Sequence, residues 1–492
     1  MKKFIPVLLS IVLLFSMIAG VASAATFELT SDTSVQVEEL QAFSDLKAMF
    51  DATPVDLAAI KASYEQKMQA KVVAVNPEID TNISMTLDLA IDGSLSAGQA
   101  KQAIDKGLQW YFYAVITTLT KETAKAALVA KDLATAKIAL EQAIELYQGA
   151  LQGTAQKRDS YYKKYGVMTQ DTIDSIALQG MLEAVENGDV LAYNVNRQIL
   201  DKTLIKVFAL AAMKYAVSAP LADAAKAKIE MTEGYFFYMP IYNSLKGGSA
   251  VDAKFIADAF ASGDVTKLKS AEINEAFSAA IIGKISNYFK ATIDKDMASG
   301  ELEKAQEHAM EGNMFLEALD VLIKEELGED AYVAVKAEAT KYYNAVKAND
   351  TNAANVHSFN ILKVIAKLNG VQTEVDSNVL TVNGEATTAD TTSYINAETD
   401  RTLVPVRFIT QAVGATVDWD NSTKTVTVTQ DGVEIKLVVG QTAMVKGGVA
   451  LETVLDQPVT LKDNYTFVPL RAITEILGYK VFYQAGEIII VR

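Results

Sequence analysis

The chain has 492 residues, with 45 Lys and Arg side chains against 61 Asp and Glu side chains, and a formal net charge of −16. This surplus of carboxylates repels phosphate backbones, and the sequence has no dense basic patch, so nucleic acid is not expected as a partner. The sequence contains no cysteine, which excludes disulfides, thiol catalysis and cysteine-ligated metals. Such an acidic chain favours solubility and weak cation binding.

Residues 1–24 predict a secretory signal peptide. Lys2 and Lys3 precede a mainly apolar run from Ile5 to Ala19, and Ala22-Ser-Ala24 is a small-residue cleavage site. We therefore expect a secreted protein, free or associated with the cell wall. No second long apolar run follows, so we expect no transmembrane segment after cleavage.

Residues 25–368 have the composition of an all-helical domain. Alanine, lysine, glutamate and leucine dominate, and residues 124–147 keep a helical period throughout. Breaks near Asn76-Pro77, Ala219-Pro220 and Gly247-Gly248 divide the segment into about a dozen helices. The predicted fold is a large all-α bundle or an irregular helical repeat, as one domain or two subdomains.

A weak internal repeat runs through this helical segment. Phe112, Phe237 and Phe315 occupy similar segments, and each is followed nine residues later by a lysine. The phenylalanines are 125 and 78 residues apart, so the repeat is irregular. Two interpretations remain open. Buried aromatic helix segments resemble one another, or the pattern descends from duplication of a helical hairpin.

The best candidate for metal chemistry is the pair His308 and Glu311. Three residues apart on a helix, the two side chains share one face, and an imidazole and a carboxylate can bind one metal ion. On the weak repeat they align with Glu230 and Glu233. The alternative is a solvated helix face.

His308-Ala-Met-Glu311 resembles the His-x-x-Glu motif of imelysin-like proteins, which are secreted, all-helical and linked to iron uptake. Only this tetrapeptide and the helical texture match, and Gln306 replaces the glycine that normally stands two residues before the histidine. The resemblance implies extracellular metal (iron) binding through His308 and Glu311 as an alternative function.

Other catalytic motifs are missing from the sequence. It has no His-Glu-x-x-His, no Gly-x-Ser-x-Gly and no phosphate-binding glycine loop. The second histidine, His357, is expected to cap a helix or to be exposed. We therefore predict a protein that is not an enzyme, with no catalytic residues and no cofactor; a hydrolase with an unrecognised site is a third alternative.

Residues 371–492 contain one unit twice. The segment Arg401–Gly414 is similar in sequence to Tyr465–Gly478, 64 residues later. This similarity marks an internal duplication. The offset relates three pairs of structural residues: Pro405 and Pro469, Arg407 and Arg471, and Gly414 and Gly478. Each copy predicts a strand, a hairpin, a strand, a short helix that starts at the proline and ends at the glycine, and two more strands. The helices are expected near 405–413 and 469–477.

The segments Arg401–Arg407, Gly414–Asp420 and Thr423–Val428 resemble the copper amine oxidase N-terminal-like domain, or stalk domain, of secreted proteins from Gram-positive bacteria. The second copy departs from the pattern because Phe482 or Tyr483 stands where Trp419 would recur. The resemblance implies a duplicated α+β stalk-like domain. In the oxidases, copper belongs to a different domain that needs three histidines, and this chain has two, so no copper oxidase activity is expected.

The sequence thus predicts a multidomain, non-catalytic protein that is structural, adhesive or ligand-binding. A cell-wall or other extracellular surface component is the expected partner. The helical and stalk-like parts are expected to fold separately, with a join near Asn369-Gly370. Trp419 lies on an alternating strand beside a short helix and is expected to be largely buried.

Overall fold

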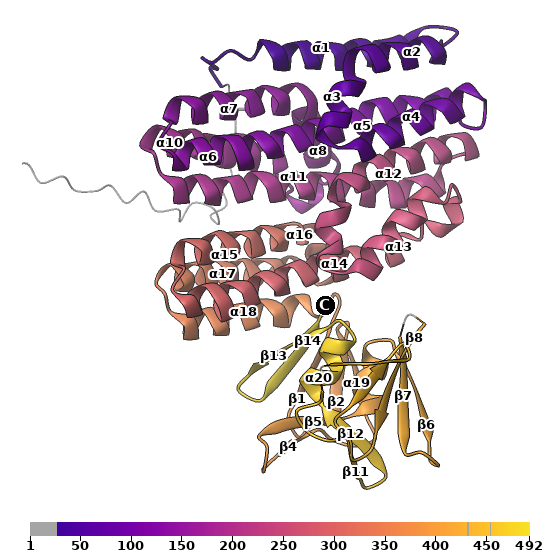
Figure 1. The fold of residues 1–492 in the computed structure, drawn as a ribbon, viewed down its shortest axis with the longest axis vertical. Coiled ribbons are helices and arrows are strands. Elements are labelled where there is room, and N and C mark those ends of the chain that lie inside the picture. The colour runs from indigo at the N-terminus through magenta and orange to yellow at the C-terminus, as the bar shows by residue number, and fades with distance from the viewer. Residues whose placement is uncertain (1–26, 431, 453) are drawn as a thin grey trace, which may run out of the picture.

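The structure is a computed structural model that describes residues 27–492, apart from residues 431 and 453. The signal peptide predicted at residues 1–24 therefore lies outside the described residues. Helices fill the chain from Ser34 to Ile365, and strands with two short helices fill it from Val371 to Val491. Figure 1 shows the helices stacked in successive layers, with the β-rich part below the last of them.

Many helices begin at side chains that satisfy free backbone N–H groups. Ser96 and Gln99 form a reciprocal capping box, and the Asp189 side chain accepts a hydrogen bond from the backbone N–H of Ala192. The α-helices of this part are α1 (Ser34–Ala48), α2 (Leu57–Tyr64), α3 (Ala70–Val75), α4 (Pro77–Ile91), α5 (Ala97–Thr118), α6 (Lys125–Val129), α7 (Leu133–Leu146), α8 (Gln152–Tyr161), α9 (Thr169–Asp171), α10 (Gln179–Asn187), α11 (Val190–Ser218), α12 (Ala224–Lys246), α13 (Ala250–Ala261), α14 (Ser270–Lys290), α15 (Leu302–Glu317), α16 (Asp320–Glu326), α17 (Glu329–Lys347) and α18 (Thr351–Ile365).

Helix α11 is the central element of the helical part. It packs against α12 on one side and α15 on the other, and α12 and α15 in turn contact α5 and α14. Side chains all around α11 are buried, which is typical of an interior helix. Within the described chain, Val190–Leu221 alone has the length and apolar character to cross a membrane, and 72% of its most apolar window is buried inside the protein.

The β-rich part, here called the β module, forms three antiparallel sheets in the described residues. We call β13-β14-β1-β2-β3 the docked sheet, β10-β9-β8-β7-β6 the open sheet and β11-β12-β5-β4 the central sheet. The two predicted helices are present as α19 (Val406–Ala412) and α20 (Leu470–Ile476). The strands are β1 (Val371–Glu374), β2 (Val379–Val382), β3 (Glu385–Thr388), β4 (Tyr394–Asn396), β5 (Arg401–Pro405), β6 (Thr416–Asp420), β7 (Thr425–Gln430), β8 (Val433–Val438), β9 (Met444–Lys446), β10 (Val449–Ala450), β11 (Thr460–Lys462), β12 (Tyr465–Pro469), β13 (Lys480–Gln484) and β14 (Glu487–Val491).

The two copies in the β module exchange strands. In the central sheet β5 pairs with β12, and Val404 lies opposite Val468, its own counterpart 64 residues later. A pseudo-two-fold axis therefore passes through this pair. The docked sheet joins the first three strands of copy one (β1, β2 and β3) to the last hairpin of copy two (β13 and β14). The open sheet joins the first three strands of copy two (β8, β9 and β10) to the last hairpin of copy one (β6 and β7). The duplication predicted from the sequence thus forms one interlocked unit.

The predicted ends of the two short helices are nearly right. Pro405 and Pro469 were expected at the first helical positions, but they are the last residues of β5 and β12, and each helix begins one residue later. Proline still suits this position because its N–H is not needed there. Gly414 and Gly478 end the helices with φ of 78° and 84°, the left-handed conformation that favours glycine.

Trp419 is more exposed than predicted, with 38% of its surface accessible. Its side chain lies on the same face as buried Val426, which stands opposite it in the sheet. However, β6 is the edge strand of the open sheet, so the ring has a strand neighbour on one side only. Tyr483, 64 residues later, lies on the edge strand β13 and is 52% exposed.

The docked sheet joins the β module to the helices. Ile489 and Val491 of β14 are buried in the helical core rather than in the core of the module. The Ser286 hydroxyl donates a hydrogen bond to the backbone oxygen of Arg492 at 2.5 Å, and Arg492 Nε lies 3.5 Å from Asp252 Oδ2. The two parts therefore share a core and a polar contact.

This shared core differs from the separate folding predicted with a join near 369–370. Helix α18 does end at Ile365 and β1 begins at Val371, but the shared core is formed by the hairpin of β13 and β14, far along the chain from that join. Glu487–Val491 has four consecutive buried residues, the pattern of a strand covered on both faces.

Replacing Ile489 by alanine tests the junction. We expect Ile489→Ala to lower the free energy of unfolding by about 2–5 kcal/mol, because it leaves a cavity between β14 and the helices. Thr427 is the equivalent position of the open sheet, because it lies opposite Asp418 as Ile489 lies opposite Phe482. Thr427→Ala should change stability by less than about 0.5 kcal/mol. The chain has two tryptophans, so Trp419 fluorescence in a Trp110→Phe background reports unfolding of the module. Equal effects of both substitutions would contradict the shared core.

Candidate functional site

Two clusters of lysine, carboxylate and aromatic side chains lie between the central helices. Each combines an Asp-Lys pair from one helix, a glutamate and a phenylalanine from a second, and a tyrosine from a third. The first cluster contains Asp105, Lys106, Glu233, Phe237 and Tyr215. The second cluster contains Asp201, Lys202, Glu311, Phe315 and Tyr288.

The second cluster is built around the ammonium of Lys202. Its Nζ lies 2.6 Å from Asp201 Oδ2 and 3.2 Å from Glu311 Oε1. The same nitrogen is 5.6 Å from the centroid of the Phe315 ring, on which Tyr288 stacks at 5.8 Å. The cation therefore has two carboxylates and an aromatic ring as neighbours.

The first cluster repeats this arrangement around Lys106. Its Nζ lies 2.7 Å from Asp105 Oδ2, 3.5 Å from Glu233 Oε1 and 5.0 Å from the Phe237 centroid. Tyr215 stacks on Phe237 with ring centroids 6.1 Å apart. The glutamate and phenylalanine recur 78 residues later in the second cluster, and the Asp-Lys pair recurs 96 residues later.

These offsets favour duplication as the source of the weak repeat, because equivalent residues make equivalent contacts in α12 and α15. Phe112 does not take part; it packs on Phe43 and Tyr111. The sequence signal that sequence analysis missed was the Asp-Lys dipeptide, at 105–106 and 201–202. Together with the contacts of Lys106 and Lys202, it indicates that α5 corresponds to α11, whereas the phenylalanine spacing made α5 the counterpart of α12 and α15.

Electrostatics keep the second cluster charged. Burial opposes ionisation of Asp201, but Lys202 and the Tyr113 hydroxyl outweigh it, so the pKa of Asp201 lies below its usual value. Burial alone would lower the pKa of Lys202, yet Asp201 and Glu311 raise it. Both groups therefore stay ionised at neutral pH. The lysine fills the space between the carboxylates, and the cluster fixes the packing of its three helices.

The structure does not bring His308 and Glu311 together as a pair of ligands. His308 Nδ1 lies 2.5 Å from Oδ2 of the fully buried Asp296, whereas Glu311 binds Lys202. Across the described residues, no group of three or more His, Cys, Asp or Glu side chains is placed to hold a metal ion. The imelysin-like hypothesis therefore gains no support from the geometry.

The second histidine is also held by a carboxylate. His357 Nδ1 lies 2.8 Å from Oε2 of Glu338, which also accepts hydrogen bonds from Asn360 at 2.8 Å and Lys341 at 2.7 Å. Burial alone would raise the pKa of Glu338, but these donors outweigh it and lower the pKa to about 2. His357 thus links α18 to α17, in place of the helix cap or exposed position expected from the sequence.

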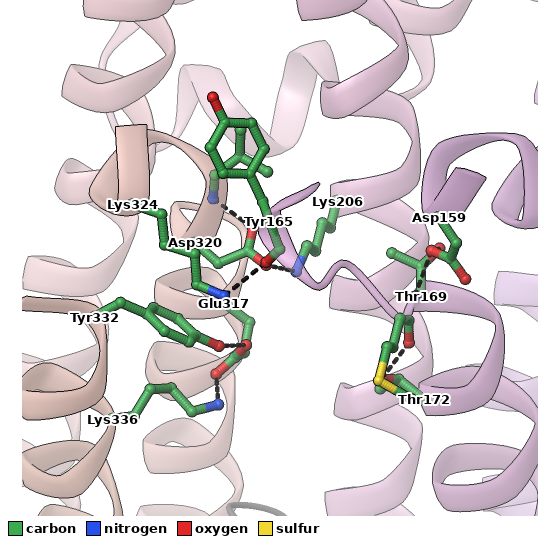
Figure 2. A network of polar contacts seen from close by, with 12 residues as sticks. Asp159, Tyr165, Thr169, Thr172, Lys206, Glu317, Asp320, Lys324, Tyr332 and Lys336 are labelled. Carbon is green, nitrogen blue, oxygen red and sulfur yellow. Dashed lines mark hydrogen bonds and ion pairs between the residues drawn. The ribbon is translucent and has the colours of Figure 1, made fainter. Parts of the chain in front are cut away.

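A polar seam connects the layers on either side of α11 (Figure 2). Lys206 of α11 lies 2.7 Å from Asp320 of α16, and both side chains are buried. One turn further along α16, Lys324 donates to the backbone oxygen of Tyr165 at 2.6 Å. Glu317 accepts from the Tyr332 hydroxyl at 3.2 Å and pairs with Lys336. Like the clusters, the seam satisfies its charges internally.

The structural residues predicted in the β module occupy equivalent places in its two copies. Arg407 and Arg471 lie in the first turns of α19 and α20, with exposed side chains. The backbones of Pro405 and Pro469 instead take part in the central pairing of β5 with β12. The motif therefore positions the strand-to-helix turns beside the pseudo-two-fold axis.

Residues 381–491 match the family described as copper amine oxidase N-terminal domain. The match covers the C-terminal quarter of the chain and confirms the resemblance seen in Arg401–Arg407 and its repeat. The helical part matches no family. No curated protein and no solved structure matches the chain.

Removing the ammonium of Lys202 tests the role of the second cluster. Lys202→Met leaves Asp201 and Glu311 buried without their cation, so we expect a loss of about 3–5 kcal/mol in the free energy of unfolding. Adding Glu311→Leu should recover part of this loss, which a double-mutant cycle measures by denaturant unfolding. Lys121→Met, an exposed control, should change stability by less than about 0.5 kcal/mol. Strict additivity of the two cluster substitutions would contradict the assigned pairing.

The lowered pKa of Glu338 predicts that its carboxylate stabilises the fold in a pH-dependent way. Its pKa falls from 4.5 to about 2 on folding, so its contribution is fully present above pH 4.5 and is lost as the pH falls towards 2. Glu338→Gln should therefore have a lower melting temperature than wild type at pH 6. This difference in melting temperature should be smaller at pH 2.5. A difference that stays constant between these two pH values would show that the carboxylate is not responsible.

Proposed function

We propose that this protein is secreted and associated with the cell wall, where it acts as a structural or adhesive component without catalysis. The match of residues 381–491 supports the proposal, because the N-terminal domain of copper amine oxidase is non-catalytic on its own. The signal peptide predicted at residues 1–24 supports secretion. The charged clusters of the helical part, each filled by its own lysine, favour a structural role.

The observation that carries the proposal is the difference between the two pseudo-symmetric outer sheets. The docked sheet directs apolar side chains outward, towards the helices: Phe482, Ile489 and Val491. The open sheet has polar residues at the equivalent positions: Asp418, Thr427 and Thr429. The same framework therefore has one face that binds the helices and one that faces solvent.

The chemistry of the open face suits a glycan. Thr425, Thr427 and Thr429 alternate along β7 and are half-buried, so their side chains share the outward face. Alternate residues of a strand lie about 7 Å apart, and each hydroxyl can both donate and accept a hydrogen bond. The neighbouring strands add the exposed side chains of Asp418 and Lys436. A hydroxyl-rich cell-wall glycan is the partner that this surface fits best.

Sedimentation with purified Gram-positive cell walls tests the proposal. We expect the full chain, lacking residues 1–24, to sediment with the walls. The variant Thr425→Val/Thr427→Val/Thr429→Val should bind at least five-fold more weakly, because valine keeps the shape and strand preference but removes the hydroxyl. Thr387→Val/Thr388→Val, on the exposed strand β3, is the matched control and should bind normally. A wild-type chain that stays in the supernatant would overturn the proposal.

A further inference from the structure

One buried arginine of the helical part differs from the other buried basic residues. In the described chain, five basic residues are at most 7% exposed: Lys106, Arg158, Arg197, Lys202 and Lys206. Four of them have a carboxylate oxygen within 3 Å, supplied in that order by Asp105, Glu307, Asp201 and Asp320. Arg158 is the exception: it is 5% exposed, and its Nε and Nη1 atoms have no hydrogen-bond partner.

An unpaired guanidinium in this position is physically costly. A charge removed from water without a counter-ion is strongly unfavourable, and arginine cannot escape the cost by losing its proton. The other four buried cations show how this protein avoids the cost, namely with an adjacent carboxylate. Among the described residues, no carboxylate lies within ion-pair distance of Arg158, so its counter-ion must come from outside those residues.

A second cation, Lys214, interacts electrostatically with Arg158. Lys214 of α11 is half-buried, and no carboxylate of the described residues lies within ion-pair distance of it. Burial lowers the pKa of Lys214 and Arg158 adds to this effect, whereas Glu230 and Glu233 oppose it. Those two carboxylates have partners of their own: Glu233 lies 3.5 Å from Lys106 and Glu230 lies 3.7 Å from Lys226.

The surroundings of Arg158 are otherwise satisfied. The Tyr162 hydroxyl, one turn further along the helix, donates to the backbone oxygen of Leu210 at 3.1 Å. Thr154, one turn earlier, donates to Gln109 Oε1 at 2.9 Å. The groups around Arg158 that still lack a partner are therefore positively charged hydrogen-bond donors. Such donors bind oxyanions.

We propose that Arg158 and Lys214 form a binding site for a small oxyanion, a phosphate or carboxylate group, between α8 and α11. The guanidinium supplies the positive charge and an N–H donor to an oxygen of the anion, because its Nε and Nη1 have no partner within the protein. Lys214, which is the more exposed of the two, contacts the anion from the solvent side. The nearby Glu230 and Glu233 restrict the site to a small anion held directly by the arginine. This site does not depend on the open sheet or on the proposed function.

Thermal unfolding of the full chain tests the site, with inorganic phosphate and acetate as probes against chloride at equal ionic strength. A ligand that binds the folded state raises the melting temperature, and the rise grows with the ratio of free ligand concentration to dissociation constant. We expect wild type and Lys157→Met, an exposed neighbour that loses the same charge, to respond alike. Arg158→Met should lose the specific response, and the matched control corrects for the general stabilisation by phosphate.

Calorimetry with the same two anions gives a second measurement. We expect Lys214→Met to weaken binding at least five-fold while the protein stays folded, which keeps the test valid if Arg158→Met does not fold. A response to phosphate alone identifies a phosphate-type ligand, and a response to acetate identifies a carboxylate. The proposal is overturned if neither anion binds the wild type more tightly than chloride, or if Arg158→Met or Lys214→Met binds as the wild type does.

Discussion

The arrangement of the helical part depends on charges that are buried together along α11. Lys202 contacts Asp201 on its own helix and Glu311 on α15, and Lys206 contacts Asp320 on α16. A slide of neighbouring helices by one turn would disturb the apolar packing, and here it would also leave an ammonium and a carboxylate buried apart. We infer that these pairs fix the register of the layers, and that the apolar core provides most of the stability.

The β module uses a different principle, in which symmetry of the backbone is combined with asymmetry of the side chains. The pairing of Val404 with Val468 fixes a pseudo-two-fold axis, so the two outer sheets have the same geometry. Ile489 and Thr427 occupy equivalent places, yet one is buried against helices and the other faces solvent. Gene duplication followed by substitution at a few outward positions can therefore give one framework both an attachment face and a free face.

Much of this organisation follows from the sequence, and the exceptions have physical reasons. The offset of 64 residues predicted the repeated helices and their glycine ends, since both are set by local backbone preference. The exposure of Trp419 depends on whether another strand pairs with the free edge of β6. The sequence of β6 does not contain this information. The binding of His308 by Asp296, in preference to Glu311, is likewise a contact between helices. Helical spacing predicts that two side chains share a face but not which neighbour that face meets.

The strand exchange has a consequence for the order in which the protein can fold. Strand β14 lies between β13 and β1, and it also fills part of the helical core. The docked sheet therefore cannot form until residues 487–491 are available, although β1 begins at Val371. Contacts between such distant segments slow folding, because a long loop must close before any of them is made. Under the secretion proposed above, such a delay would keep residues 371–491 extended while they are threaded through a translocation channel.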